Sequence, residues 1–197
     1  MSGIYDEKYY QTKNYKKYIE RGTETSHYHI IADETIDLLQ KLKRPYDTIL
    51  DFGCAVGFMM EALQKYTDNI CGVDISDWAR SVAKEKGLEV TKEPQYDKKY
   101  DVMYALDVLE HLNEDDLTNL FEQIRVDTIV YKLPVTNFRG GPYVFDIAEA
   151  DKTHEIRWTD DDWRNFFDYY GYFCLDINLS KIYHQRGAFC GIAIKRR

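Results

Sequence analysis

The stretch from Thr48 to Phe58, TILDFGCAVGF, is the most informative part of the chain. An apolar run ends at Asp51, and small residues follow it directly. A short apolar run bounded by glycines is typical of a buried strand. Glycine lets a turn adopt unusual dihedral angles and lets the backbone approach a ligand closely. The stretch therefore predicts a buried strand, a turn into a helix, and a ligand site at that turn.

Beyond this stretch, strand-like and helix-like segments alternate along the chain. Continuous apolar strands that alternate with helices imply a parallel sheet covered by helices on both faces. A turn near Gln185–Gly187 joins the last two strands, which predicts an antiparallel pair. The predicted strands are 48–52, 69–74, 88–92, 100–107, 128–135, 172–179 and 187–196, and the predicted helices are 57–66, 76–87, 115–124 and 159–171.

Two segments flank this alternating pattern. Residues 1–45 are predicted to form a helical lid, with a tyrosine-rich start and a helix over 23–43 that Pro45 stops. Residues 136–158 show no clear period, and a long segment without regular structure is usually a functional loop. We therefore expect 136–158 to be a substrate loop. Thr159 and Asp162 then predict a capping box at the start of the next helix.

Composition narrows the class of protein. The formal net charge of −8 argues against a nucleic-acid partner, whose binding depends on Lys and Arg neutralising phosphates. The four cysteines form no CxxC pair, which indicates buried thiols in a reducing compartment. The chain carries no apolar run long enough to cross a bilayer. We expect a cytoplasmic protein of one domain, 1–197, with no membrane partner.

The turn and Asp74 together suggest a nucleoside cofactor. Asp74 ends the second predicted strand, where a carboxylate can accept hydrogen bonds from both ribose hydroxyls. The dinucleotide fingerprint is GxGxxG, but here the glycines at 53 and 57 are too widely spaced and Phe58 stands where the last glycine should fall. Asp51 beside the turn would repel a pyrophosphate and suits a cofactor that carries an ammonium and a sulfonium.

Three motifs together resemble those of class I S-adenosylmethionine-dependent methyltransferases. ILDFGCAVGF is similar to the family's DxGCGxG motif, and VDIS (Val73–Ser76) and ALDVLEHL (Ala105–Leu112) match the motifs that follow it. With its HxxRWT-like element, the chain looks closest to a branch that often acts on small molecules or sugars. Ala55 replaces the middle glycine of the family motif. Because alanine is small, we expect cofactor binding to survive this departure.

The resemblance implies a fold and a role for the turn. The fold is α/β and Rossmann-like, with a seven-stranded, mostly parallel sheet of order 3-2-1-4-5-7-6, strand 7 antiparallel, and helices on both faces. In such a fold the loop beneath the methionine part of the cofactor is formed by Gly53, Cys54, Ala55 and Gly57. Asp51 orders that loop and approaches the cofactor's ammonium through water.

Further cofactor contacts follow from the same resemblance. Asp74 binds the ribose 2′- and 3′-hydroxyls, and Ile75 packs on the adenine. Asp107 and Val108, after the predicted strand 100–107, face the amino-acid end of the cofactor. The residues that contact the adenine amine are left open, because the segment KEPQYDKKY carries no motif.

The catalytic residues are less well defined by the sequence. An oxygen acceptor needs a base or a metal to take its proton, and an imidazole, with an unperturbed pKa of about 6.5, can serve near neutral pH. His154 and His111 are the candidates. Each histidine has an alternative, purely structural role. His111 could form a hydrogen bond to the loop backbone, and His154 could hold the loop against the sheet. Asp115 and Asp116 are typical of the first turn of a helix, so no metal site is predicted.

The sequence therefore predicts a methyltransferase of class EC 2.1.1. It would take a methyl group from S-adenosyl-L-methionine, release S-adenosyl-L-homocysteine, and act on a small-molecule acceptor such as a sugar or glycan hydroxyl. A nucleic-acid methyltransferase, a non-catalytic cofactor-binding module and an NAD-dependent dehydrogenase are the alternatives. The N/D-P-P-Y/F motif of DNA aminomethylases is absent where ALDVLE stands, and the glycine spacing disfavours the dehydrogenase.

Overall fold

The computed structural model describes residues 5–10 and 25–196. By its contacts the chain divides into two compact units, Met1–Gln95 and Tyr96–Arg197. Each unit is described in turn below. The expectation that 1–197 forms a single domain stays a prediction.

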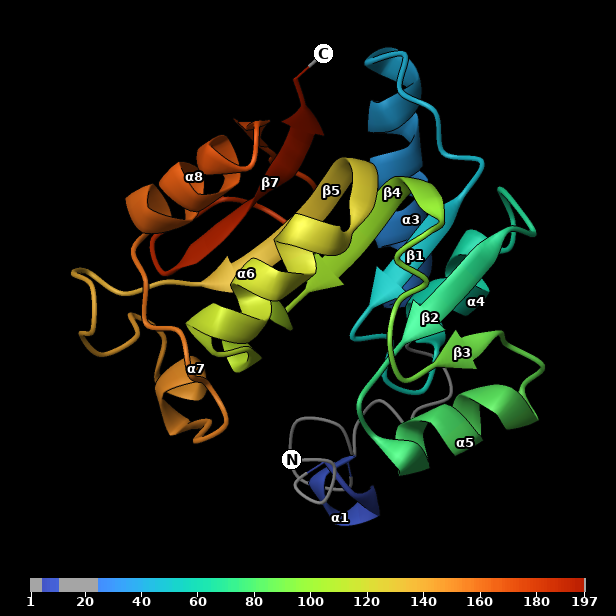
Figure 1. Cartoon of the computed structure of the whole chain (residues 1–197), viewed down its shortest axis with the longest axis horizontal. Helices are drawn as coiled ribbons and strands as arrows, with labels where there is room; N and C mark the ends of the chain where they lie inside the picture. Colours follow the sequence, from blue (N-terminus) through green and yellow to red (C-terminus); the bar gives the residue numbers. More distant parts are fainter. Residues whose placement is uncertain (1–4, 11–24, 197) are drawn as a thin grey trace. The chain divides into compact units, whose positions relative to one another are not determined.

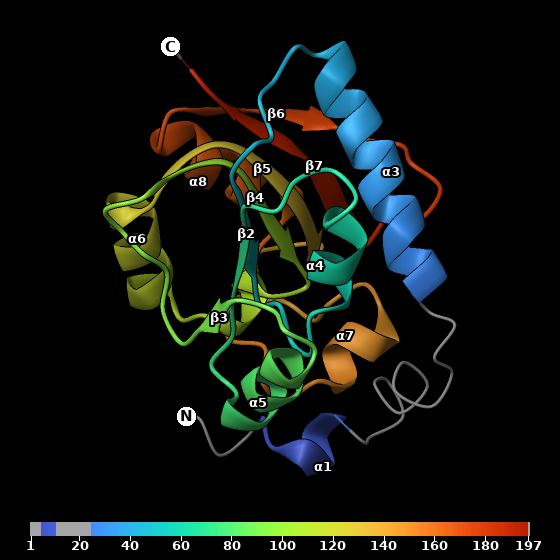
Figure 2. The same cartoon turned by 90° about the vertical axis from the view of Figure 1, so that its right-hand side faces the viewer.

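The first unit contains three short parallel strands, with β2 paired to both of the others. Helix α3 packs against α4, and α5 packs against β3, as Figure 2 shows. Helix α4 is shorter than the predicted helix 57–66. The elements of this unit are α1 (Glu7–Tyr10), α3 (Thr25–Lys41), β1 (Ile49–Phe52), α4 (Phe58–Leu63), β2 (Ile70–Val73), α5 (Asp77–Glu85) and β3 (Val90–Thr91).

The end of α3 differs from the sequence expectation that Pro45 stops the helix. Lys43 adopts a left-handed conformation with φ 54°. Its N–H donates to the Gln40 carbonyl at 3.0 Å, and the Arg44 N–H donates to the Leu39 carbonyl at 2.9 Å. These two bonds form a Schellman motif, which satisfies the last carbonyls of the helix. The helix therefore ends through this cap, ahead of the proline.

The second unit is built on longer strands. Strands β4 and β5 are parallel, whereas β7 runs antiparallel to both β5 and β6. Helix α8 packs against β6 and β7, and Figure 1 shows it beside β7. The elements are β4 (Lys99–Leu106), the 3₁₀ helix η1 (Leu109–His111), α6 (Glu114–Gln123), β5 (Arg125–Pro134), α7 (Asp146–Ala150), α8 (Asp160–Tyr169), β6 (Tyr172–Asp176) and β7 (Ala188–Lys195).

The strand order confirms the predicted fold class. The seven strands follow the order β3-β2-β1-β4-β5-β7-β6, with β7 antiparallel to its neighbours. The predicted turn before β7 is present as a bridge between Gln185 and Ala188. The capping box at α8 is also present, because Thr159 accepts from the Asp162 N–H while Asp162 accepts from the Thr159 N–H. The turn and the capping box depend on local sequence, which explains why they could be predicted, whereas the strand order was expected from the family resemblance.

The predicted substrate loop, 136–158, is more regular than the sequence suggested. It contains α7, a helix of 5 residues, and a bridge between Thr136 and Tyr143. The Thr136 N–H also donates to the Trp158 carbonyl at 3.0 Å, so the two ends of the segment are held together. The expectation of a segment without regular structure was therefore wrong, because a helix this short has too few residues to show a period.

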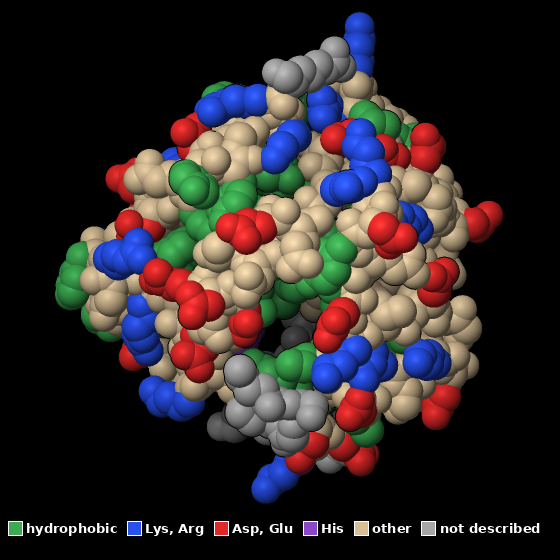
Figure 3. Space-filling model, in the orientation of Figure 1, with side chains coloured by type: hydrophobic (Ala, Val, Ile, Leu, Met, Phe, Trp, Pro, Cys, Tyr) green, Lys and Arg blue, Asp and Glu red, His purple; other side chains and the backbone are tan. Residues whose placement is uncertain are grey.

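Charged side chains of both signs are visible on the surface. On the face shown in Figure 3, Lys and Arg side chains lie among Asp and Glu side chains. Within the ranges 5–10 and 25–196, no helix combines the length and the apolar character needed to cross a membrane.

Candidate functional site

The turn after β1 has an unusual backbone. Gly53, Ala55 and Gly57 all have positive φ, at 77°, 46° and 85°. The N–H groups of Gly53 and Cys54 both donate to the carbonyl of Val73, at 2.7 and 2.9 Å, which ties the turn to the end of β2. The left-handed region costs a non-glycine residue about 1–2 kcal/mol. The turn therefore holds Ala55 in a conformation that alanine rarely adopts.

Asp74 is the side chain that organises this turn. Its carboxylate is 7% exposed. One oxygen accepts from the Ala55 N–H at 2.8 Å, and the other accepts from the Ser76 N–H at 2.8 Å. Burial raises the pKa of Asp74, while these two bonds act in the opposite direction. Asp74 thus connects the turn to the start of α5, a role that the sequence argument missed.

Asp51 lies at the same turn in a different environment. Its side chain is 5% exposed, and among the described residues its Oδ2 atom has no hydrogen-bond partner. Burial, followed by the charge of Asp74, raises the pKa of Asp51 to about 7. A buried polar atom without a partner is costly, and a cationic ligand would provide one.

The described start of the chain covers this turn. Tyr10 is 3% exposed, packs with Val56 and Ala79, and stacks on Trp78 at a centroid distance of 5.3 Å. The Ser76 hydroxyl donates to the carbonyl of Tyr5. Residues 5–10 therefore lie over the turn and the start of α5. Two further tyrosines of the tyrosine-rich start, Tyr15 and Tyr18, lie outside the described residues.

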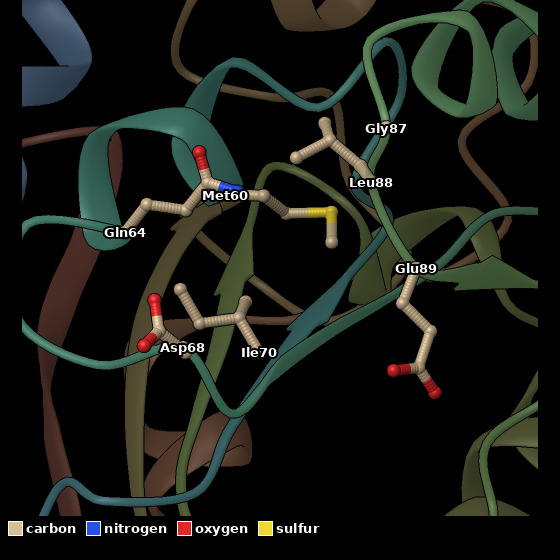
Figure 4. A pocket seen from close by; sticks show the side chains of 7 residues that line it. All are labelled: Met60, Gln64, Asp68, Ile70, Gly87, Leu88 and Glu89. Atoms are coloured by element: carbon tan, nitrogen blue, oxygen red, sulfur yellow. The ribbon is translucent and has the colours of Figure 1, made fainter.

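A separate hollow of about 210 Å³ opens in the first unit. Figure 4 shows the seven residues that line it, which come from α4 and the segment after it, from the start of β2, and from the segment that leads into β3. It shares no residue with the predicted cofactor set. Ligand pockets usually measure roughly 300–1,000 Å³, so this hollow is too small for a nucleoside cofactor.

In the second unit, the predicted catalytic residues form one cluster. His111 and His154 meet with ring centroids 4.5 Å apart. The His154 Nε2 atom lies 3.9 Å from Glu110 Oε1 and 3.9 Å from Asp151 Oδ2. Glu110 is 1% exposed, and its Oε2 atom has no partner among the described residues. The fold thus brings His111 and His154, which the sequence argument considered separately, together with Glu110 and Asp151.

Hydrogen bonds hold the predicted substrate loop to η1. The Glu110 carbonyl accepts from the N–H groups of Glu155 and Ile156, at 2.9 and 3.0 Å. The His111 Nδ1 atom lies 2.9 Å from the Thr153 hydroxyl and 3.3 Å from its carbonyl. The structural alternative for His111, a bond to the loop backbone, is therefore present.

Burial favours the neutral forms of this cluster. It lowers the pKa of His111 to about 4, with His154 as a second cause, and it also lowers the pKa of His154. It raises the pKa of Glu110 well above the usual range. Outside the cluster, Asp107 forms an ion pair with Lys132 and has a positive φ of 53°. Val108 is half-buried beside it.

Comparisons with known proteins agree with this picture. A family model described as a methyltransferase domain matches residues 24–126, just over half of the chain. The chain is 27% identical over 77 residues to a ubiquinone biosynthesis O-methyltransferase of Hydrogenovibrio crunogenus. That match spans about a third of each protein, at 33% of this chain and 32% of the relative.

Solved structures resemble the whole fold. A S-adenosylmethionine-dependent methyltransferase from Clostridium acetobutylicum superimposes with a TM-score of 0.67 at 15% identity, over 92% of this chain and 98% of that one. Magnesium protoporphyrin IX methyltransferase from Synechocystis, solved with bound SAM, gives 0.61 at 16% identity, over 96% of this chain and 94% of that one. At these identities the likeness concerns the fold.

Proposed function

Because the chain belongs to the methyltransferase-domain family, we propose that it transfers a methyl group from S-adenosylmethionine to a small-molecule acceptor, such as a sugar or glycan hydroxyl. The proposed acceptor class has support from two of the similar proteins, whose names refer to ubiquinone biosynthesis and to magnesium protoporphyrin IX. The acidic net charge of −8 is consistent with it.

The observation that carries the cofactor proposal is the pair of buried carboxylates at the turn after β1. Asp51 and Asp74 are 5% and 7% exposed. A negative charge on either carboxylate makes it energetically unfavourable to place another anionic group beside it. A diphosphate would add such charge, whereas the ammonium and sulfonium of S-adenosylmethionine would offset it. The unpartnered Asp51 Oδ2 atom suits the ammonium, either directly or through water.

Asp74 is suited to the ribose. Each carboxylate oxygen has two acceptor sites, and the bonds from Ala55 and Ser76 occupy one on each oxygen. The remaining sites can accept the 2′- and 3′-hydroxyls. We assign the other contacts on the family resemblance: the turn residues Gly53, Cys54, Ala55 and Gly57 to the methionine part, Ile75 to the adenine, and Asp107 and Val108 to the amino-acid end.

The exposed surface of Ile75 supports its part of this assignment. Ile75 is 39% exposed, whereas its neighbours Asp74 and Ser76 are buried. A flat adenine ring would cover it. Residues 5–10 would act as part of the lid, because they already lie against the same turn.

The proton of an oxygen acceptor requires a partner. His154 and His111 remain our candidates for a general base, and burial keeps both imidazoles in the neutral form that can accept a proton. His154 is the better candidate, because a pKa of about 4 makes His111 a weak base.

Calorimetric titration of the full chain with S-adenosylmethionine and S-adenosylhomocysteine tests the proposal. We expect both to bind, and Asp74→Asn to weaken binding by roughly 10- to 100-fold through loss of charge-assisted bonds. Asp77→Asn is the matched control, because Asp77 lies three residues further on with its side chain 80% exposed. Absence of binding at millimolar concentrations, or preferential binding of NAD, contradicts the proposal. Formation of S-adenosylhomocysteine with a panel of hydroxyl acceptors then identifies the substrate.

A further inference from the structure

We propose that Glu110, His111 and His154 bind a divalent transition-metal ion. One possible ligand atom from each residue lies within 4.8 Å of those of the other two. Two imidazoles and a carboxylate suit ions such as Zn²⁺, Co²⁺ and Fe²⁺, whereas Mg²⁺ and Ca²⁺ prefer oxygen ligands. The sequence argument predicted no metal because it considered the acids Asp115 and Asp116 and assigned them to the first turn of a helix.

The buried carboxylate of Glu110 is a second, independent observation. Its side chain is 1% exposed, and Oε2 has no hydrogen-bond partner among the residues that the structure describes. Buried polar atoms in folded proteins nearly always have a partner, and the exceptions call for an explanation such as an unobserved ion. A metal ion bound to this carboxylate would supply the missing interaction.

The hydrogen bonds around His111 determine which of its nitrogens can be a ligand. The Thr153 hydroxyl donates its only proton to Asp151 Oδ1, at 2.6 Å. It must therefore accept from His111 Nδ1, which lies 2.9 Å away. This tautomer leaves the lone pair of His111 on Nε2. Ligating histidines typically donate their other N–H in this way, to a carbonyl, a carboxylate or water, which fixes the ring.

Only small adjustments are needed to form the site. Bonds of about 2.0–2.2 Å to a tetrahedral ion place neighbouring ligand atoms roughly 3.4 Å apart. The His154 Nε2 and Glu110 Oε1 atoms are 3.9 Å apart, so small side-chain rotations suffice. Asp151 Oδ2, also 3.9 Å from His154 Nε2, is placed to be a fourth ligand or to accept from a metal-bound water.

A metal here would change the catalytic assignment. The part of this inference that concerns catalysis rests on the proposed methyl transfer, but the metal binding does not. A bound divalent ion lowers the pKa of a coordinated oxygen, so an acceptor hydroxyl held by the ion could lose its proton without an imidazole base. His111 and His154 would then be ligands.

The test is metal binding by the full chain, prepared without a histidine tag and stripped with EDTA. We expect one equivalent of Zn²⁺ by calorimetry, and visible absorption bands when Co²⁺ is added. Glu110→Gln and His154→Gln each remove a proposed ligand, so each should weaken Zn²⁺ binding by more than about 100-fold. Thr153→Val removes only a hydrogen-bond partner of the ligand His111, so it should weaken Zn²⁺ binding by about 10-fold. His184→Gln is the matched control, since its Nδ1 atom also lies 3.9 Å from a carboxylate, Asp176.

The possible results distinguish metal binding at this cluster from a role of the metal in methyl transfer. No stoichiometric binding of Zn²⁺ or Co²⁺, or equal binding by wild type, Glu110→Gln and His154→Gln, overturns the site. Circular dichroism checks that each variant is folded, and Thr153→Val gives a readout that leaves all three ligands in place. If Zn²⁺ binds as expected but EDTA leaves methyl transfer unchanged, the metal site stands and its catalytic role is overturned.

Discussion

Asp74 and Glu110 are both buried carboxylates, and their surroundings are opposite. Asp74, in the first unit, accepts two backbone N–H bonds at 2.8 Å. Glu110, in the second unit, has an oxygen without a partner among the described residues. The first carboxylate completes a local structure, whereas the second lacks an interaction. We therefore expect Asp74 to be needed for folding as well as for the proposed cofactor binding, and Glu110 to serve the proposed metal site.

The first test of this comparison replaces each acid by its amide. Asp74→Asn turns an acceptor into an NH₂ group that faces a backbone N–H, which should lower the free energy of unfolding by about 2–3 kcal/mol. Glu110→Gln loses no hydrogen bond that the structure shows at Oε2, so we expect a change below about 1 kcal/mol. Urea unfolding in the presence of EDTA measures both.

This pair is decisive because the two substitutions are chemically identical. Equal losses would show that Glu110 has a structural partner, and the contrast between the two carboxylates would then be lost. A loss of unfolding free energy in Asp74→Asn alone supports the contrast between the two carboxylates.

A third buried carboxyl group, Asp51, should make the stability of the protein depend on pH. Its folded pKa of about 7 lies above the unfolded value, so the folded protein keeps a proton that the unfolded chain has released. This contribution to stability is complete below about pH 4 and is lost as pH rises towards 7. Wild type should lose about 2–3 kcal/mol more than Asp51→Asn between pH 5 and pH 8. Parallel pH profiles for the two proteins would exclude an elevated pKa.

The strand order was expected from the family resemblance, whereas the capping box could be predicted from a short local pattern, Thr159 with Asp162. The cap at Lys43 could not be predicted, since lysine carries no preference for a left-handed φ. Helix α7 was missed because its five residues show no period.

The two candidate sites were predictable to different degrees. The turn and Asp74 follow consecutive strands, and a known family motif marks them. His111 and Thr153 are 42 residues apart, with α6, β5 and the first part of the predicted substrate loop between them, so their contact is a product of tertiary structure. No spacing in the sequence indicates that His111 and His154 share a cluster with Glu110.

A smaller effect is expected at Ala55, whose φ of 46° is the strained feature of the turn. Ala55→Gly removes the left-handed penalty of about 1–2 kcal/mol but adds chain entropy to the unfolded state, so we expect a net gain of about 0.5–1 kcal/mol in thermal unfolding. Gly57→Ala is the control and should lose stability, because Gly57 has a positive φ of 85° and the added Cβ would also meet the Leu88 side chain. Loss of stability in Ala55→Gly would contradict the strain.

The smallest predicted effect concerns competition for Asp74. Hydrogen bonding from the Tyr10 hydroxyl lowers the pKa of Asp74, after larger effects of burial, of the Ser76 and Ala55 bonds, and of the Arg80 charge. Tyr10→Phe keeps the stacking on Trp78 but removes a donor that would compete with the ribose hydroxyls. We expect S-adenosylmethionine to bind about 2- to 5-fold more tightly, which is less than 1 kcal/mol.

Tyr9→Phe, at a neighbouring partly buried tyrosine, is the matched control and should leave the affinity unchanged. Weaker binding by Tyr10→Phe would mean that the Tyr10 hydroxyl contacts the cofactor itself. In that case Asp74 and Tyr10 would act together on the ribose, and the carboxylate that completes the turn would not be the sole determinant of cofactor binding there.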